Sequence, residues 1–162
     1  MTDVTWREHR VVWNDVEAIG SNQFYYIVPD DEVDAKTLCG ILNSRMTWLM
    51  CELKGRWAEG AGMARSRLMV YETEQLPIPD PRSLTDEECE RISECLDELM
   101  EREVELGEDA SVETTEAERD ALDTAVLEAI GMEDRLQEIK EGVERMVTMR
   151  EEAAGESTDV LI

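Results

Sequence analysis

Apolar residues recur every three or four positions between Leu38 and Leu53, and this spacing predicts a long helix over residues 34–54. Three acidic residues at 30–32 precede it, where they suit the positive end of a helix dipole. Gly55 follows the last apolar position and predicts the end of the helix. The apolar stripe consists of Leu38, Ile41, Leu42, Met46, Leu49, Met50 and Leu53.

Three more amphipathic helices are predicted in the second half of the chain. The first follows Thr85 and the second follows Thr114 or Thr115, and a glutamate three residues after Thr85 and after Thr115 can complete a capping box. A polar linker at 107–113 separates these two helices, and Gly131 suits the C-terminal end of the second. The third helix follows at once, and a tail of residues 156–162 ends the chain.

Short β-strands are expected in the first half. Phe24–Val28 is an aromatic and β-branched run that ends at Pro29, and this composition predicts a buried strand. Arg10–Trp13 and Leu68–Tyr71 have the composition of two further short strands.

Together these elements predict an α+β fold, in which a small antiparallel β element with a long helix precedes a C-terminal three-helix region. We divide the chain into an α+β part (1–82), an acidic helical part (83–155) and the tail. Leu76–Pro81 holds three prolines, and it predicts a stiff, extended crossing packed through Leu76 and Ile78. Asn43-Ser44 is unusual inside a helix. This pair forms either a polar surface facet or a contact that holds the crossing.

The charge of the chain is extreme and unevenly placed. Forty acidic residues against 16 basic ones give −24, and 13 of the basic residues are arginines. Residues 1–82 carry 13 acidic and 9 basic residues, whereas residues 83–162 carry 27 and 7, so their net charges are −4 and −20. This composition is similar to that of proteins from halophiles that keep a high salt concentration inside the cell. The salt screens the repulsion between the many acidic side chains. The competing interpretation is an acidic binder of basic partners or a DNA mimic.

One window, residues 43–71, is basic, with five basic residues against two acidic ones. It contains the glycine-rich loop 55–67. Arginines can grip phosphates or contact guanine edges, and glycines let a backbone approach a phosphate closely. The alternative is a solvated loop whose arginines pair with nearby acids. Tyr25 and Tyr26 could stack on bases or fill a small core. The candidate DNA-binding residues are Arg45, Lys54, Arg56, Trp57, Arg65 and Arg67.

Other site chemistry is sparse. The four cysteines form no Cys-x-x-Cys pair, and the one histidine is His9, so we expect no metal site and buried free thiols. No signal peptide and no long apolar run is present, which predicts a cytoplasmic protein without membrane contact.

Several segments together resemble the C-terminal, target-recognition end of N6-adenine DNA methyltransferases from restriction-modification systems. The order is Leu42-Asn43-Ser44, then the glycine-rich loop, then Leu76-Pro77-Ile78-Pro79. Phe24-Tyr25-Tyr26-Ile27 and the segment 122–131 are also similar, so the resemblance covers about residues 10–150. The Leu-Pro-x-Pro element is similar to that of type I specificity subunits as well.

The resemblance implies a module that contacts DNA while a separate domain methylates. The Asn-Pro-Pro-Tyr-type loop and the glycine-rich turn for S-adenosylmethionine are both missing, so no catalytic residues and no cofactor are expected in this chain. S-adenosylmethionine would bind the partner, a methyltransferase or endonuclease catalytic subunit. The alternative is an acidic helical module for protein interaction or homo-oligomerisation that does not bind DNA.

Overall fold

The computed structural model of the chain describes residues 4–5, 8–14, 24–57 and 66–159. Its helices are α1 (Ala35–Asn43), α2 (Arg45–Lys54), α3 (Val70–Thr73), α4 (Asp86–Leu106), α5 (Glu116–Ala129) and α6 (Leu136–Asp159). Its strands are β1 (Val4–Thr5), β2 (Arg56–Trp57) and β3 (Ser66–Arg67), and 3-10 turns cover Pro81–Ser83, Gly107–Asp109 and Glu133–Arg135.

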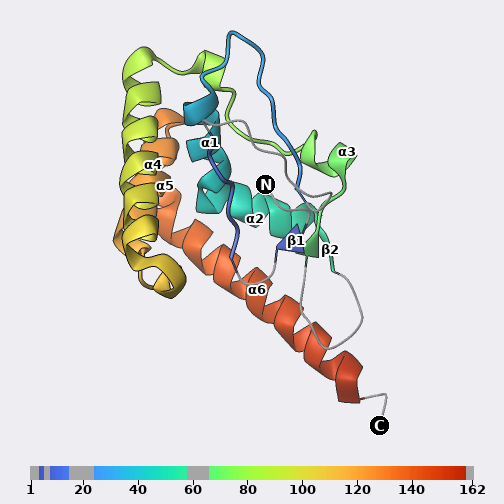
Figure 1. Cartoon of the computed structure of the whole chain (residues 1–162). Coiled ribbons are helices and arrows are strands. Elements are labelled where there is room, and N and C mark those ends of the chain that lie inside the picture. The colour runs from blue at the N-terminus through green and yellow to red at the C-terminus, as the bar shows by residue number, and fades with distance from the viewer. Residues whose placement is uncertain (1–3, 6–7, 15–23, 58–65, 160–162) are drawn as a thin grey trace.

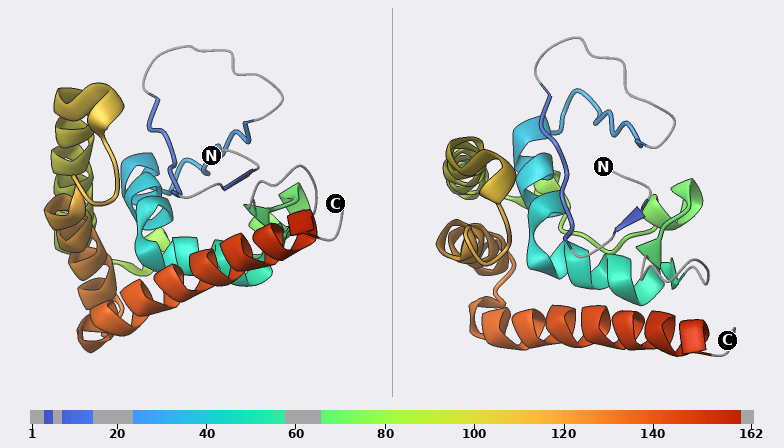
Figure 2. Two further views of the ribbon diagram at one scale, coloured as in Figure 1. Left: turned by 90° about the horizontal axis from the view of Figure 1, so that it is seen from below. Right: turned by 60° about the horizontal axis from the view of Figure 1, so that its bottom comes forward.

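The described chain is mostly helical and carries one small antiparallel sheet, in agreement with the α+β prediction at that level. The strand order is β1-β3-β2, and each strand has two residues. Figures 1 and 2 show α4 and α5 side by side, with α6 running away from them along α2. The sheet and α3 lie at the other end of α2 (Figure 1).

One main core joins the two halves of the chain. Ile41 of α1, Ile92 of α4 and Leu122 of α5 are each at most 1% exposed and belong to one cluster. Gly40 lets α1 and α4 approach closely, because a Cβ there would lie 2.6 Å from Cγ2 of Ile92. Burying apolar side chains of this size contributes about 1.5–3 kcal/mol each, so this seam is a main source of stability.

The long helix predicted at 34–54 is in fact two helices that meet at Ser44. Ser44 has an extended backbone (ψ 150°), and its hydroxyl accepts a hydrogen bond from the N–H of Thr47 as the N-cap of α2. Asn43 is buried, and its amide group both accepts from the N–H and donates to the carbonyl of Val11, each at 2.8 Å. Neither expectation for this pair was right, because it breaks the helix and binds an N-terminal segment instead.

The helix boundaries follow the sequence signals closely. Asp34 caps α1, and Thr85 and Glu88 form the predicted capping box of α4. Gly131 has φ 68° after α5, a conformation that favours glycine. Thr115 does not form the predicted box, because its hydroxyl donates to the carbonyl of Ser111. Residues 156–159, expected in the tail, continue α6.

The predicted strands were placed wrongly. Residues 10–13 have no regular structure, and Phe24–Val28 forms a single bridge at Phe24 with most of its side chains exposed. Beyond β3, residues 70 and 71 belong to α3 rather than to a strand. A β-prone segment becomes a strand only where a neighbouring backbone pairs with it, and composition does not reveal that neighbour. The Leu76–Pro81 crossing does pack through Leu76 and Ile78, as predicted.

His9 is buried beneath α1, and its Nε2–H donates to the carbonyl of Leu42 at 2.8 Å. Burial lowers the pKa of His9 from 6.5 to about 4. As the pH falls, His9 therefore takes up its proton in the unfolded chain before it does so in the folded chain. The stability that the neutral, buried His9 contributes is fully present above about pH 6.5 and is lost as the pH approaches 4.

We expect the free energy of unfolding to fall by roughly 3 kcal/mol more in the wild type than in His9→Gln between pH 7 and pH 4. Glutamine keeps a donor for Leu42 but does not titrate. Urea unfolding of both proteins across this range measures the difference. Parallel stability curves would show that His9 titrates alike in the folded and unfolded chains.

Candidate nucleic-acid interface

Basic side chains gather where α2 meets the sheet. Lys54 is the last residue of α2, and β2 begins two residues later with Arg56. Arg56 lies directly opposite Arg67 in the β2–β3 pair, so both side chains start from the same face of the sheet. Lys54, Arg56 and Arg67 are all exposed. Three cations thus lie within one end of a strongly acidic chain.

Gly55 fixes this arrangement through close packing. A Cβ at Gly55 would lie 2.0 Å from Oγ of Ser66 on β3 and 2.7 Å from the carbonyl oxygen of Cys51, so a larger residue would force its neighbours to shift. Trp57 pairs with Ser66 and is 38% exposed. Because side chains alternate along a strand, Trp57 points to the face opposite Arg56.

Arg56 is held by two neighbours on α3 but stays open to solvent. Its Nε donates to Glu72 at 3.0 Å, and its guanidinium lies 5.9 Å from the ring centroid of Tyr71, whose hydroxyl it also contacts. The side chain of Arg56 is nevertheless 65% exposed. Hydrogen bonds, first from the N–H of Met69 and then from Arg56, keep the pKa of Glu72 below its usual range.

Facing arginines do not stabilise so small a sheet. Like charges directly opposite each other are destabilising, and an ion pair in contact with water, such as Arg56–Glu72, contributes little to stability. A polyanion bound across the strands would turn this cost into a gain.

The predicted DNA-binding residues fall into three groups. Lys54, Arg56 and Arg67 come together with Trp57 nearby, as described above. Arg65 lies outside the described residues. Arg45 lies in the core, 4% exposed, with its guanidinium on carboxylates of α5, so we leave it out of the interface. In agreement with the alternative interpretation of the loop, Arg56 does pair with an acidic residue, Glu72, although its side chain stays 65% exposed.

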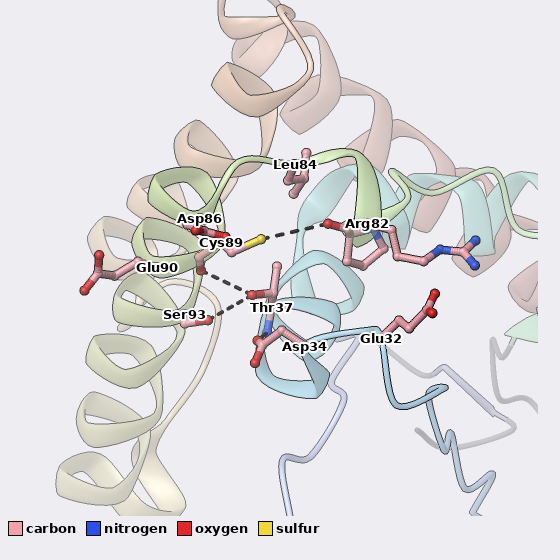
Figure 3. A pocket seen from close by; sticks show the side chains of 10 residues that line it. Glu32, Asp34, Thr37, Arg82, Leu84, Asp86, Cys89, Glu90 and Ser93 are labelled. Carbon is pink, nitrogen blue, oxygen red and sulfur yellow. Dashed lines mark hydrogen bonds between the residues drawn. The ribbon is translucent and has the colours of Figure 1, made fainter.

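A hollow of about 430 Å³ lies between α1 and the start of α4. Figure 3 shows its polar lining, in which Thr37 donates to the carbonyl of Cys89 at 3.2 Å and contacts Ser93. Glu32, Asp34, Asp86 and Glu90 line it against one cation, Arg82. Such a lining repels phosphate, so this hollow does not extend the basic interface.

Reactive groups are scarce among the described residues. No cluster of histidine, cysteine and acidic side chains there could hold a metal ion. Burial raises the pKa of the Cys39 thiol to about 11 and that of Cys51 to about 12, so both stay protonated near neutral pH. No helix in the described part of the chain is long and apolar enough to cross a membrane.

Residues 1–112 match the model of a protein family, the C-terminal domain of type II methyltransferase M.Eco57I. The matched residues make up well over half of the chain. The chain belongs to this family. No curated protein and no solved structure matches it. The matched range contains the whole sheet and helices α1 to α4, and therefore every described residue of the basic interface.

Membership in the M.Eco57I C-terminal domain family confirms the resemblance to the C-terminal region of an N6-adenine methyltransferase. Sequence reasoning missed Tyr71 and Glu72 as partners of Arg56. They lie 15 and 16 residues away in the chain, at and just after the end of the strand that we expected at 68–71, so no local signal linked them. Only the antiparallel turn back from β2 through β3 to α3 brings them together.

Proposed function

We propose that this chain is the non-catalytic DNA-recognition part of an adenine-specific type II methyltransferase and acts with a separate catalytic domain. The observation that carries the proposal is the exposed pair Arg56 and Arg67 across β2 and β3, with Lys54 beside it. Arginine is suited both to phosphate and to guanine edges, because its planar fork donates two parallel hydrogen bonds. S-adenosylmethionine would bind the catalytic partner, since this sequence lacks the motifs for it.

The distribution of charge over the chain supports an approach of DNA from the side of the sheet. The second half of the chain carries −20, and its helices α4 and α5 pack beside α1, away from the sheet, whereas α6 runs along α2 toward it. DNA approaching the acidic helices would be repelled, and DNA approaching the sheet would meet cations first. The acidic helices thus limit the ways in which a duplex can approach.

We expect Arg56→Ala and Arg67→Ala each to weaken duplex binding and to reduce the slope of log affinity against log salt by about 1, because each removes one phosphate contact. Fluorescence anisotropy of a labelled duplex over a series of KCl concentrations measures both quantities. Arg67→Lys keeps the charge and should keep most of the slope.

Arg135→Ala is the matched control. Arg135 is 48% exposed and pairs with Glu138 at 2.7 Å, much as Arg56 pairs with Glu72, but it precedes α6 in the acidic part. The Arg135→Ala variant should bind the duplex as tightly as the wild type does. If the two sheet variants also bind as tightly as the wild type, these arginines do not contact DNA.

A further inference from the structure

An uncharged groove of about 580 Å³ opens on the side of α1. Its walls are the irregular segments 11–14 and 24–29, and residues of α1 such as Leu38 and Leu42 form its floor. None of its lining residues is charged, in a chain in which 35% of residues are charged. Its volume lies within the range of pockets that bind small organic ligands.

Aromatic side chains are concentrated in this groove. Trp13, Phe24, Tyr25 and Tyr26 line it, half of the eight aromatic residues in the whole sequence. Phe24 is 43% exposed and Tyr26 is 60% exposed, so both residues are accessible from solvent. Asn14 adds an exposed amide, which can both donate and accept hydrogen bonds. Flat, apolar ring surfaces with one amide suit a planar, uncharged heterocycle.

One wall of the groove contacts the chain next to the basic interface. The hydroxyl of Tyr25 donates to the carbonyl of Leu68 at 2.9 Å, and Leu68 directly follows Arg67. In Figure 1 the segment 24–30 runs from the start of α1 toward the sheet. Exposed acids at 30–32 border the end near α1, where they repel phosphate. A ligand that carries phosphates would therefore enter from the end beside Arg67.

We propose that this groove binds one nucleobase that has left the DNA stack. The proposal rests on the DNA-recognition function above and adds a second element to it, in which the sheet holds the phosphates and the aromatic groove takes a base. Every base has a face that can stack on an aromatic ring, so the groove needs no particular sequence. A base that is already unpaired costs the least to bind, because no base pair has to open.

The test uses the intact chain and two duplexes that differ at one position. One is fully paired, and the other carries an unpaired 2-aminopurine bulge. We expect the bulged duplex to bind about five-fold more tightly or better, with quenching of the 2-aminopurine fluorescence as it stacks. The double variant Phe24→Ala/Tyr26→Ala should lose this preference and still bind the paired duplex. Thermal unfolding of the double variant, compared with the wild type, sets a temperature at which both proteins are folded during the binding measurement.

Val104→Ala is the control, because Val104 is 82% exposed on α4 and outside the groove. Equal binding of the two duplexes, or a preference that survives in the double variant, would overturn the groove proposal and leave the DNA-recognition proposal intact. No binding of either duplex would overturn both. If Tyr26→Ala instead converts a dimer to a monomer in sedimentation, the groove is a protein interface and the base-binding proposal is wrong.

Discussion

Arg150→Met should destabilise the protein by about 3–5 kcal/mol, because it leaves a buried carboxylate without its cation. Arg150 of α6 donates from Nε and from an Nη to the two carboxylate oxygens of Glu52 on α2, each at 3.0 Å. The two side chains are 1% and 0% exposed. Water therefore cannot replace the lost guanidinium, and a typical domain is stable by only about 5–15 kcal/mol.

The double variant Glu52→Gln/Arg150→Met should recover most of this loss, because a neutral pair no longer strands a charge. Glutamine is the better replacement for Glu52, since its amide oxygen can still accept the indole N–H of Trp48, which lies 3.1 Å from Glu52. Urea unfolding at one salt concentration gives the free energy of unfolding of the wild type, of Arg150→Met and of the double variant. Arg145→Met, an exposed change on the same helix, should stay within about 0.5 kcal/mol of the wild type. A similar small effect at Arg150 would mean that the ion pair does not hold α6 on α2.

The helices could be predicted from the sequence because their signals are local. A capping box needs residues three apart, and Thr85 with Glu88 forms one as predicted. The positive φ of Gly131 likewise follows from a glycine placed after an apolar stripe. Packing partners across the chain left no such signal. The partners Glu52 and Arg150 are 98 residues apart and Asn43 and Val11 are 32 apart, and nothing in the sequence around either residue of a pair indicates its partner.

The candidate site was predictable only in part for the same reason. The excess of basic residues at 43–71 identified the region, but charge counting treats every arginine alike. Arg56 and Arg45 differ because Ser44 ends α1 and turns α2, and this turn points Arg45 at α5. The aromatic run Phe24–Val28 was expected to be a buried strand, whereas its three aromatic side chains, together with Trp13, line an open groove. Exposure depends on the whole fold, and hydrophobicity alone does not give it.

Arg45→Met should also cost about 3–5 kcal/mol, and it should do so without a change in the DNA contacts of the folded protein. Arg45 donates to Asp123 at 2.8 Å and to Asp120 at 2.7 Å, and it also pairs with Glu116. Lys140 of α6 pairs with Asp120 and Glu116 too, so one network joins α2, α5 and α6. Asp123 is 3% exposed, and without Arg45 its buried charge would lose the guanidinium.

Asp123→Asn provides the matched comparison. Asparagine can still accept the backbone N–H of Arg45, which lies 2.7 Å from Asp123, and Arg45 would keep its other two carboxylates, so we expect a smaller loss than in Arg45→Met. If the two residues act together, the double variant will lose less stability than the sum of the single ones. Duplex affinity measured at a temperature where all variants are folded separates stability from function. Arg45→Met should bind as the wild type does, whereas Arg56→Ala should be as stable as the wild type and bind weakly. A loss of affinity in folded Arg45→Met would return Arg45 to the DNA-binding set and require the interface to reach α5.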